Sequence, residues 1–364
     1  MNERITLKIL HILETAQGGL ATYLHLLHTN LPKNWEQDFI LPRSDIKNYD
    51  KTMSITPFDS ENRSLKGLWR MIQTMRRNIS NQKPDIIFFH STFSLVALAA
   101  LKVISPNIPT IYCAHSWAIN RFENKNSVKA RLVRLIEGGA SSLATRTLNI
   151  SNADHALAKK YGYGGNHITI ENAARYPALD ARDDLFSTDP ASIHLLFVGR
   201  FDRQKGLDVL LDAFEKSRIA RSDLRLHIIG AKVRNDSGHL SLPQGVELVG
   251  WVDSKRIDDW YASADILILP SRWEGLPLVL TESMRNGTPV ACSRRSGMEN
   301  LISEGKTGFS FELDANALCN RLLLLEKQTL RNMRQPVLSA FRGRYSEEIW
   351  TGKMKNLVNE VVLT

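Results

Sequence analysis

Short apolar segments alternate with helix-like segments along almost the whole chain, and this alternation constrains the fold most strongly. The first apolar segment, residues 7–13, is followed by the pair Gly18-Gly19 and by a helical pattern over residues 20–27. A strand, a glycine turn and a helix form the opening of a βαβ unit. Further strands are predicted over residues 38–42, 53–57, 86–89, 110–114, 148–151 and 168–170, and helices over 66–77, 93–104 and 127–137. Repeated units of this kind build a parallel sheet that helices cover on both faces.

A second series of the same kind follows a polar segment without periodicity. That segment, residues 173–192, contains Pro177 and Pro190 and is predicted to link two domains. Beyond it, strands are predicted over residues 193–198, 226–229, 246–249, 266–269, 290–292 and 308–311, and a helix over 345–362. A chain of 364 residues exceeds the ~250–300 residues that one core supports. Two α/β domains are therefore expected, without the G-x-G-x-x-G sequence of dinucleotide-binding folds.

Cysteine spacing and apolar run length bear on the cellular compartment. Cys113, Cys292 and Cys319 lie far apart and include no C-x-x-C pair, which argues against a disulfide framework or a zinc site. The apolar run near the N-terminus is too short for a signal peptide. The most apolar region, residues 86–104, is interrupted by polar residues, whereas a membrane span needs ~20 apolar residues. We therefore expect a cytoplasmic location.

Positive charge is concentrated in the first half of the chain. Residues 1–172 hold 21 Lys and Arg against 13 Asp and Glu, a net charge of +8, whereas residues 173–364 hold 26 against 25, a net charge of +1. Two basic amphipathic segments, residues 66–77 and 125–137, lie in this half. Either they lie in the interface of an anionic bilayer, or they bury their apolar stripes in the core. Nucleic acid is a weaker expectation, because no reader motif or exposed aromatic pattern accompanies the charges.

The stretch at residues 265–287 combines features of an anion-binding site. An apolar strand leads to Glu274, and a helix is predicted to start at Gly275-Leu276-Pro277, with Pro277 in the first turn, where its missing amide costs nothing. Glu282 lies about two turns into this helix, and Gly287 ends it. A carboxylate at a strand end beside a helix N-terminus suits an anionic, hydroxyl-rich ligand.

A second group of polar residues follows the strand at residues 193–198. This strand ends at Gly199, and Arg200 and Lys205 then flank a turn before Gly206 and a helix. Ligands of open α/β sheets bind beyond the carboxyl ends of the strands. Two cations at that place suit a diphosphate, with Arg bidentate and Lys as a point charge. The alternative is a solvated loop with two ordinary surface cations.

Together these residues resemble the retaining, nucleotide-sugar-dependent glycosyltransferases of family 4 (group 1), which have the GT-B fold. The resemblance is carried by Glu274-x7-Glu282 after a strand, with Gly199-Arg200 and Lys205-Gly206 upstream, the early Gly18-Gly19, His115 after a strand, and the run GMENLISEGKTGFSFE over residues 297–312. It is dense over residues 193–312 and thinner before them. It implies two Rossmann-like domains facing a cleft, an acceptor-side domain over residues 1–175 and a nucleotide-sugar domain over 190–344, with the helix at 345–364 packing back on the first.

The resemblance also implies a role for each matching residue. Arg200 and Lys205 would neutralise the diphosphate as it leaves, and amides of the helix near Leu276 would add their dipole to the same oxygens. Glu282 would accept the ribose hydroxyls and Glu274 would face the donor sugar. The residues expected on the acceptor side are Gly18 and Gly19, whose amides would approach the diphosphate or the acceptor, and His115, near the sugar. The family often has Asn-Gly where this chain has Asn172-Ala173, which puts that turn in doubt.

The reaction implied is transfer of a hexose-type sugar to an acceptor hydroxyl with retention of the anomeric configuration. Asp-x-Asp is absent from the sequence, so neither a metal nor a cofactor is expected. The donor is a UDP- or GDP-sugar, with UDP favoured. The acceptor is expected to be a lipid-linked or polysaccharide intermediate of bacterial surface glycan (exopolysaccharide, capsule or lipopolysaccharide) assembly, on the inner face of the cell membrane. The loops at 120–126 and 233–240 are where donor and acceptor would be selected.

Two alternatives stay open for the function, and two for single residues. The chain acts on a soluble acceptor, or it is a catalytically silent subunit that supports a partner transferase. For Glu282 the alternative is an exposed helix carboxylate without a role in binding. For His115 it is a buried, hydrogen-bonded histidine of the core.

Overall fold

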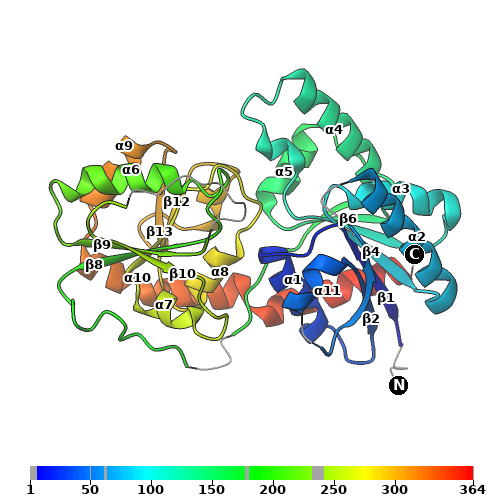
Figure 1. Ribbon diagram of the computed structural model, residues 1–364, viewed down its shortest axis with the longest axis horizontal. Coiled ribbons are helices and arrows are strands. Elements are labelled where there is room, and N and C mark those ends of the chain that lie inside the picture. Colours follow the sequence, from blue (N-terminus) through cyan, green and yellow to red (C-terminus); the bar gives the residue numbers. More distant parts are fainter. Residues whose placement is uncertain (1–5, 50, 61–63, 177–179, 232–241, 364) are drawn as a thin grey trace. The chain divides into compact units, whose positions relative to one another are not determined.

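The computed structural model describes residues 6–49, 51–60, 64–176, 180–231 and 242–363, which form two compact units (Figure 1). The first unit comprises the chain up to Asn172 together with Glu347–Thr364, and the second comprises Ala173–Ser346. Each unit has its own parallel sheet and its own helices. The chain therefore enters the second unit after residue 172 and returns to the first after residue 346.

The first unit is built on a seven-stranded parallel sheet. The strand order is β3-β2-β1-β4-β5-β6-β7. The strands are β1 (Lys8–Leu13), β2 (Glu36–Pro42), β3 (Ser54–Phe58), β4 (Ile86–His90), β5 (Thr110–Ala114), β6 (Arg146–Asn149) and β7 (His167–Thr169). The helices are α1 (Gly19–Asn30), α2 (Leu65–Gln82), α3 (Ser94–Ile104), α4 (Val128–Ser141), α5 (Asn152–Lys160) and α11 (Glu347–Val362), with 3-10 turns η1 (Arg43–Asn48) and η2 (Ala118–Arg121).

The second unit is built on a six-stranded parallel sheet. Its strand order is β10-β9-β8-β11-β12-β13, which in chain order within the unit is the 3-2-1-4-5-6 arrangement of doubly wound folds. The strands are β8 (Ile193–Val198), β9 (Leu224–Ile229), β10 (Val246–Gly250), β11 (Ile266–Leu269), β12 (Val290–Ser293) and β13 (Gly308–Phe311). The helices are α6 (Leu207–Arg218), α7 (Ile257–Ser263), α8 (Leu278–Arg285), α9 (Ala315–Leu323) and α10 (Lys327–Ala340), with a 3-10 turn η3 (Met298–Leu301) and a π turn η4 (Phe341–Tyr345).

The central strands are largely apolar and buried because helices cover both faces of each sheet. Every residue of β4 and of β11 is buried, including His90 at the end of β4. Continuous rather than alternating apolar strands are typical of parallel sheets. The predicted α/β class, with parallel sheets in two Rossmann-like units, is confirmed.

Several helices are absent from the sequence-based prediction. These are α5, α7, α9 and α10. In α10 the reason is visible, because Pro336 lies inside the helix and a proline in the chain normally indicates a break. The helix accommodates it five residues before the π turn η4. Most predicted strands and helices agree with the observed bounds to within a few residues.

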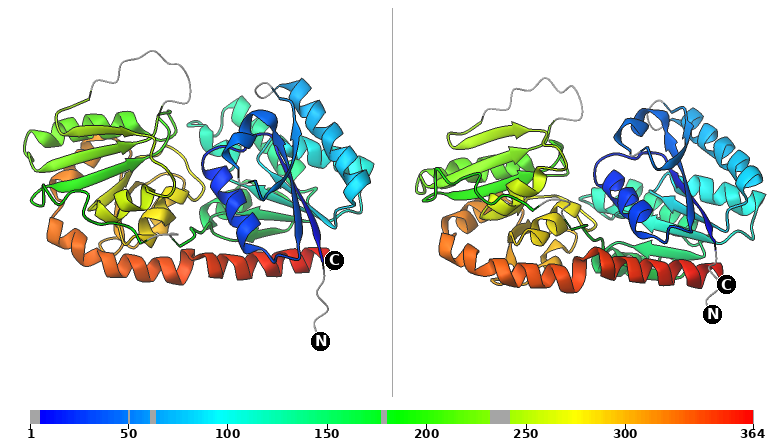
Figure 2. Two further views of the ribbon diagram at one scale, coloured as in Figure 1. Left: turned by 60° about the horizontal axis from the view of Figure 1, so that its bottom comes forward. Right: turned by 90° about the horizontal axis from the view of Figure 1, so that it is seen from below.

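The C-terminal helix α11 belongs to the first unit. Its predicted apolar stripe is buried, namely Trp350, Met354, Leu357 and Val361. The Trp350 ring packs edge-on against Tyr23 of α1, with ring centroids 5.7 Å apart. Figure 2 shows α11 (red) running beside the blue N-terminal elements of this unit. Among the residues that the structure describes, no helix combines the length and the apolarity that crossing a membrane requires.

Candidate functional site

The predicted site residues lie beside the point in each sheet where the strand order reverses. In the second unit this point separates β8 from β11; Arg200 and Lys205 follow β8, and Glu274 follows β11. In the first unit it separates β1 from β4; Gly18 and Gly19 follow β1. Open α/β sheets bind ligands in the crevice that forms at this reversal. The fold thus places a candidate group at the ligand-binding edge of both sheets.

In the second unit the loops after β8 and β11 are joined by a buried ion pair. Nζ of Lys205 lies 2.6 Å from Oε1 of Glu274, and the two side chains are 16% and 8% exposed. Gln204 donates to the other Glu274 oxygen at 3.3 Å and to the Trp273 carbonyl at 3.0 Å. The sequence predicted Lys205 for the diphosphate and Glu274 for the sugar as separate contacts. The structure holds them against each other.

Arg200 lies at the rim of the same group and is more accessible. Its guanidinium is 3.0 Å from Asp202 and its side chain is 41% exposed. The guanidinium also donates to Gln204 at 3.4 Å. We call Arg200, Asp202, Gln204, Lys205 and Glu274 the β8–β11 cluster. It presents two cations and two carboxylates at one strand edge.

Gly206 allows the two loops to approach each other closely. Its φ is +67°, and a Cβ atom there would lie 1.9 Å from the carbonyl oxygen of Pro270, at the end of β11. Only glycine tolerates both the left-handed backbone and this contact. The backbone thus fixes the positions of Lys205 and Glu274 relative to each other.

Helix α8 begins later than predicted. Its first residue is Leu278, and Pro277 is the N-cap residue, in an extended conformation and without a side-chain cap. The prediction of a helix start at residues 275–277, with Pro277 inside the first turn, is therefore wrong by one to three residues. Leu276 lies outside the helix, and its side chain is buried in the core. The reason is that Pro277 here has the β-region ψ of a cap residue, 127°.

Glu282 is a partly buried carboxylate on α8. It accepts a hydrogen bond from the Tyr261 hydroxyl at 3.0 Å. Burial raises the pKa of Glu282, while the nearby Arg285 and the Tyr261 bond favour the ionised form. The reading of Glu282 as an ordinary exposed helix carboxylate does not fit this environment. Tyr261 is a partner that no pattern in the sequence marks.

In the first unit, the Gly18-Gly19 pair forms the start of α1. Gly18 is the N-cap residue, with φ 61° and ψ −135°, and no side chain caps the helix. The loop before it is held by Asp45, whose carboxylate accepts from the Ala16 amide at 2.8 Å and from the Gln17 side chain at 2.7 Å. The amides at this helix start have no side-chain cap, and their approach to the diphosphate or the acceptor stays a prediction.

His115 is the outer member of a chain of three histidines. His11 Nδ1 lies 3.2 Å from His90 Nε2, and His90 Nδ1 lies 3.1 Å from His115 Nε2. Burial lowers the pKa of His11 and of His115 to about 3, and lowers that of His90 as well. The rings are therefore neutral at pH 7. Because a neutral ring carries a single N–H, the protonated nitrogen of His90 decides whether it donates to His115 or accepts from it, and the tautomer of His115 is tied to that of His90.

Two serines beside this chain have unusual backbone conformations. Ser91, after His90, has φ 88°, and Ser116, after His115, has φ 120°. Positive φ in a residue other than glycine costs free energy and clusters at functional sites. Ser91 also donates to Glu14 at the end of β1. Sequence reasoning missed His11, His90 and both serines, because only the strand register brings them together.

The buried alternative for His115 is correct in part. His115 is hydrogen-bonded and packs against the Tyr23 ring, with centroids 4.7 Å apart, yet it lies at the strand end and keeps partial exposure. His90, Cys113 and His115 offer ligand atoms within 4.8 Å of one another. Burial raises the pKa of Cys113 to about 12, so its sulfur is a thiol at neutral pH. In the structure His90 and His115 are hydrogen-bonded to each other, and the Cys113 thiol donates to the Tyr23 hydroxyl at 3.8 Å.

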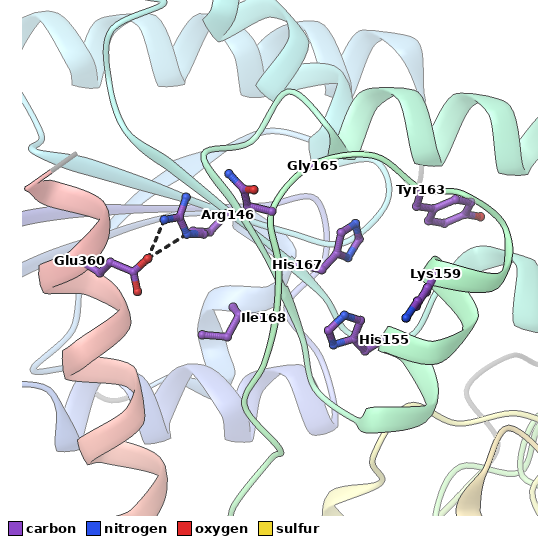
Figure 3. A pocket seen from close by; sticks show the side chains of 9 residues that line it. Arg146, His155, Lys159, Tyr163, Gly165, His167, Ile168 and Glu360 are labelled. Atoms are coloured by element: carbon purple, nitrogen blue, oxygen red, sulfur yellow. Dashed lines mark hydrogen bonds and ion pairs between the residues drawn. The ribbon is translucent and has the colours of Figure 1, made fainter.

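A pocket of about 610 Å³ lies elsewhere in the first unit. Figure 3 shows Arg146 and Glu360 on one side of it and His155, Lys159 and His167 on the other. Arg146 and His167 are the first residues of β6 and β7, so the pocket lies toward the amino ends of the edge strands. Ligands of this fold bind at the opposite ends, and Arg146 is already paired with Glu360 at 2.6 Å.

Of the two loops predicted to select substrates, the structure describes the one at residues 120–126. In the loop at 120–126, Asn120 is buried and donates to Ser116 at 3.2 Å and to Asp154 at 3.3 Å, so its side chain supports the His115 loop rather than projecting from it. The loop at 233–240 lies outside the described residues.

Both halves of the chain match models of known families. Residues 17–171 match the model described as Glycosyltransferase Family 4, and residues 186–336 match the model described as Glycosyl transferases group 1. A relative from Klebsiella pneumoniae, an uncharacterized 41.2 kDa protein in the cps region, is 29% identical over 329 residues, 85% of this chain and 87% of that protein. A D-inositol 3-phosphate glycosyltransferase from Pseudarthrobacter chlorophenolicus is 29% identical over 65% of this chain but only 61% of its own length.

Solved structures share the fold over nearly the whole chain. A sucrose-phosphate synthase from Thermosynechococcus elongatus has a TM-score of 0.84 at 18% identity, covering 98% of this chain and 99% of that one. HepE from Anabaena, in complex with UDP-glucose, has a TM-score of 0.78 at 16% identity, covering 97% and 100%. At these identities the likeness shows the fold alone.

Proposed function

Because the chain belongs to the GT-B glycosyltransferases of family 4 and group 1, we propose that it moves a hexose-type sugar from a nucleoside diphosphate to an acceptor hydroxyl, with retention of configuration. One observation carries this proposal, namely the β8–β11 cluster, which sets two cations and the Glu274 carboxylate beside the strand reversal of the second unit. This edge is where such folds hold phosphates.

The cluster suits the charge that develops when a nucleoside diphosphate leaves. Arg200 is accessible enough to reach a phosphate bidentately, and Lys205 supplies a second charge from a position fixed by Gly206. The N-terminus of α8, which has no side-chain cap, adds its dipole. Stabilising growing negative charge in this way lowers the barrier to bond cleavage. Glu282, held by Tyr261 at 3.0 Å, would accept the ribose hydroxyls.

The chemical step we propose takes place on one face of the sugar. The bond between the anomeric carbon and the diphosphate oxygen breaks, and the acceptor oxygen bonds to the same carbon from the same side. The acceptor proton passes to the leaving phosphate oxygen. Glu274 would hold the sugar hydroxyls and favour the positive charge that develops near the anomeric carbon, and no covalent sugar–enzyme intermediate is required. His115, kept neutral by burial, would bind a hydroxyl of the sugar or the acceptor.

The proposed acceptor is a lipid-linked or polysaccharide intermediate of bacterial surface glycan assembly, reached at the inner face of the cell membrane. The relative in a cps region supports a role in polysaccharide assembly, and the complex of HepE with UDP-glucose supports a UDP-sugar as donor. The net charge of +8 over residues 1–172 supports an anionic membrane as the place of work.

A binding panel of UDP-, GDP- and ADP-sugars tests the donor assignment. Affinity for the preferred donor should fall at least tenfold in Arg200→Ala and in Lys205→Ala, since each removes a charge-assisted contact of ~1.5–3 kcal/mol. Arg221→Ala is the matched control, because Arg221 of the same unit pairs with Asp223 at 2.8 Å away from the cluster. Unchanged affinity in both cluster variants would overturn the diphosphate assignment.

Turnover separates the sugar contact from the nucleotide contacts. Glu274→Ala should abolish transfer while nucleotide binding is largely kept. If this variant instead loses affinity for free UDP or GDP, Glu274 contacts the nucleotide and its assignment to the sugar is wrong. Equal transfer rates to soluble and lipid-linked acceptors would contradict the acceptor class.

A further inference from the structure

Helix α4 turns its large apolar side chains toward solvent. Val128, Leu132, Leu135 and Ile136 are 82%, 57%, 74% and 59% exposed. Their spacing of i, i+4, i+7 and i+8 places them on one side of the helix, and we call them the α4 stripe. The side that faces the core carries Ala130, Glu137, Gly138 and Ser141 instead. This is the reverse of an ordinary surface helix, whose apolar side faces the core.

Two contacts hold the helix in this orientation. The buried carboxylate of Glu137 accepts from the Ala118 amide and the Thr92 hydroxyl, each at 3.0 Å. At the next residue, a Cβ atom on Gly138 would lie 2.7 Å from the Tyr163 ring, so the helix lies closer to that ring than any larger residue permits. Rotating the α4 stripe inward would break these contacts. The exposure of the stripe is therefore a fixed property of the fold.

Positive charges border the α4 stripe on both sides. At 3.6 residues per turn, Lys129 and Arg131 fall on opposite edges of the stripe, and both are exposed. Helix α3, which packs against α4, adds the exposed apolar residues Val96 and Val103. Figure 1 shows α4 at the outer margin of its unit.

We propose that the α4 stripe docks on an anionic bilayer surface, with its leucines in the acyl boundary and its bordering cations at the headgroups. A helix with an apolar side, flanking cations and 14 residues lies in the interface rather than crossing the bilayer. A second copy of the chain fits less well, because it would bring together two segments of net charge +8, residues 1–172 of each copy. The inference rests on the proposed function in one respect, namely that a lipid-linked acceptor would be reached at the membrane to which α4 binds.

The stripe is connected to the candidate site through Glu137. The same carboxylate that orients α4 holds the Ala118 amide, three residues after His115, and Thr92, two residues after His90. Docking of α4 would thus set the loops after β4 and β5 at a defined position relative to the membrane. These are the loops on which the proposed acceptor would be received.

Sedimentation of the full chain with vesicles tests the docking without any donor or acceptor present. Binding to equimolar phosphatidylglycerol and phosphatidylcholine should exceed binding to phosphatidylcholine at least tenfold, because each cation strengthens anionic binding roughly fivefold. Leu132→Gln/Leu135→Gln should lower the partition coefficient at least tenfold. Its control is Ile219→Gln/Leu324→Gln in the second unit, where the side chains are 90% and 74% exposed.

The charge contribution has its own matched pair of variants. Lys129→Gln/Arg131→Gln should weaken binding to the anionic vesicles roughly 25-fold, and Lys255→Gln/Lys353→Gln should leave it unchanged. Melting temperatures confirm that each variant is folded. Equal vesicle binding by wild type and the Leu132/Leu135 variant overturns the proposal, as does a dimer that forms without lipid and dissociates in that variant. Loss of sugar transfer with vesicle binding intact would count against the proposed function and leave the docking standing.

Discussion

Replacing Lys205 by methionine should destabilise the second unit, because it leaves the Glu274 carboxylate buried without its cation. Nζ of Lys205 lies 2.6 Å from Oε1 of Glu274, and the side chains are 16% and 8% exposed. Removing one partner of a buried ion pair costs ~3–5 kcal/mol. Gln204 still donates to Glu274 at 3.3 Å, so we expect a loss at the lower end of that range, about 3 kcal/mol.

Replacing the other partner of the ion pair, Glu274→Gln, should lower the free energy of unfolding by a smaller amount. The ammonium of Lys205 is on a flexible stem and turns toward water, so the expected loss is about 1 kcal/mol. The double variant buries neither charge and should lose only about 2 kcal/mol. The two single losses exceed the double loss by about 2 kcal/mol, and this difference is the coupling energy that the ion-pair geometry predicts.

Urea and thermal denaturation of the four proteins measure this cycle. In a unit of this size 1 kcal/mol shifts the melting temperature by ~2–4 °C, so Lys205→Met should lower the transition of the second unit by roughly 6–12 °C. Lys216→Met is the control, because the Lys216–Asp212 pair is 44% and 53% exposed and such pairs contribute ~0.5 kcal/mol. Losses that simply add, or an effect of Lys205→Met as small as that of the control, would refute the reasoning.

Three further predictions concern backbone, pH dependence and positioning. Gly206→Ala should lower the free energy of unfolding by at least ~3 kcal/mol, because its Cβ would lie 1.9 Å from a backbone carbonyl oxygen. Gly305→Ala, with open space around the added Cβ, should lower it by only ~1 kcal/mol. Similar losses in urea denaturation would show that the close contact at Gly206 is relieved easily. Burial raises the pKa of Glu137 to about 7, so the stabilisation that Glu137 provides is complete below pH ~4.5 and is lost as the pH rises through 7. Across that window the free energy of unfolding of the wild type should fall by on the order of 3 kcal/mol relative to that of Glu137→Gln. A difference between the two proteins that does not change with pH would contradict the raised pKa. His90→Phe should lower kcat about tenfold with little change in the donor KM. His90→Gln keeps a hydrogen bond to His115, which is 3.1 Å long in wild type, and should therefore restore part of the lost kcat. Equal rates in the two variants would show that the His90–His115 bond does not position the His115 ring.

The positions of the candidate residues along the chain were predictable because they follow strand ends. The apolar strands at 193–198 and 266–269 are continuous and short, so the residues after them had to lie at the carboxyl edge of a parallel sheet. From this, Arg200, Lys205 and Glu274 could be assigned to one neighbourhood. The pairing of Lys205 with Glu274 could not be predicted, because it depends on side-chain reach across a close contact of two loops.

The histidine chain was not predictable for a related reason. His11, His90 and His115 are 79 and 25 residues apart along the chain, and only His115 belongs to the motifs that carry the family resemblance. Their contact arises from the order β1-β4-β5 in the sheet and from the register of those strands. A one-residue slip would turn the side chains to opposite faces.

The orientation of α4 shows a limit of periodicity itself. The pattern over residues 127–137 predicted an amphipathic helix and left open which face is buried. Two contacts decide which face is buried. Glu137 accepts from the Ala118 amide, and Gly138 packs closely against the Tyr163 ring. For the segment at 66–77 the core reading holds in part, since Met71 and Met75 of α2 are fully buried while Trp69 is 60% exposed.

The return of α11 to the first unit has a consequence for the order of folding. During synthesis the second unit, Ala173–Ser346, is a continuous segment and is complete before Glu347–Val362 has been made. The first unit lacks Trp350 and the rest of α11 until residue 362 has been added. Although domains generally fold in order from the N-terminus, here the sheet that begins the chain is the last to acquire its full core. A chain truncated after residue 346 should therefore contain a protease-resistant second unit and a first unit that is still sensitive to protease.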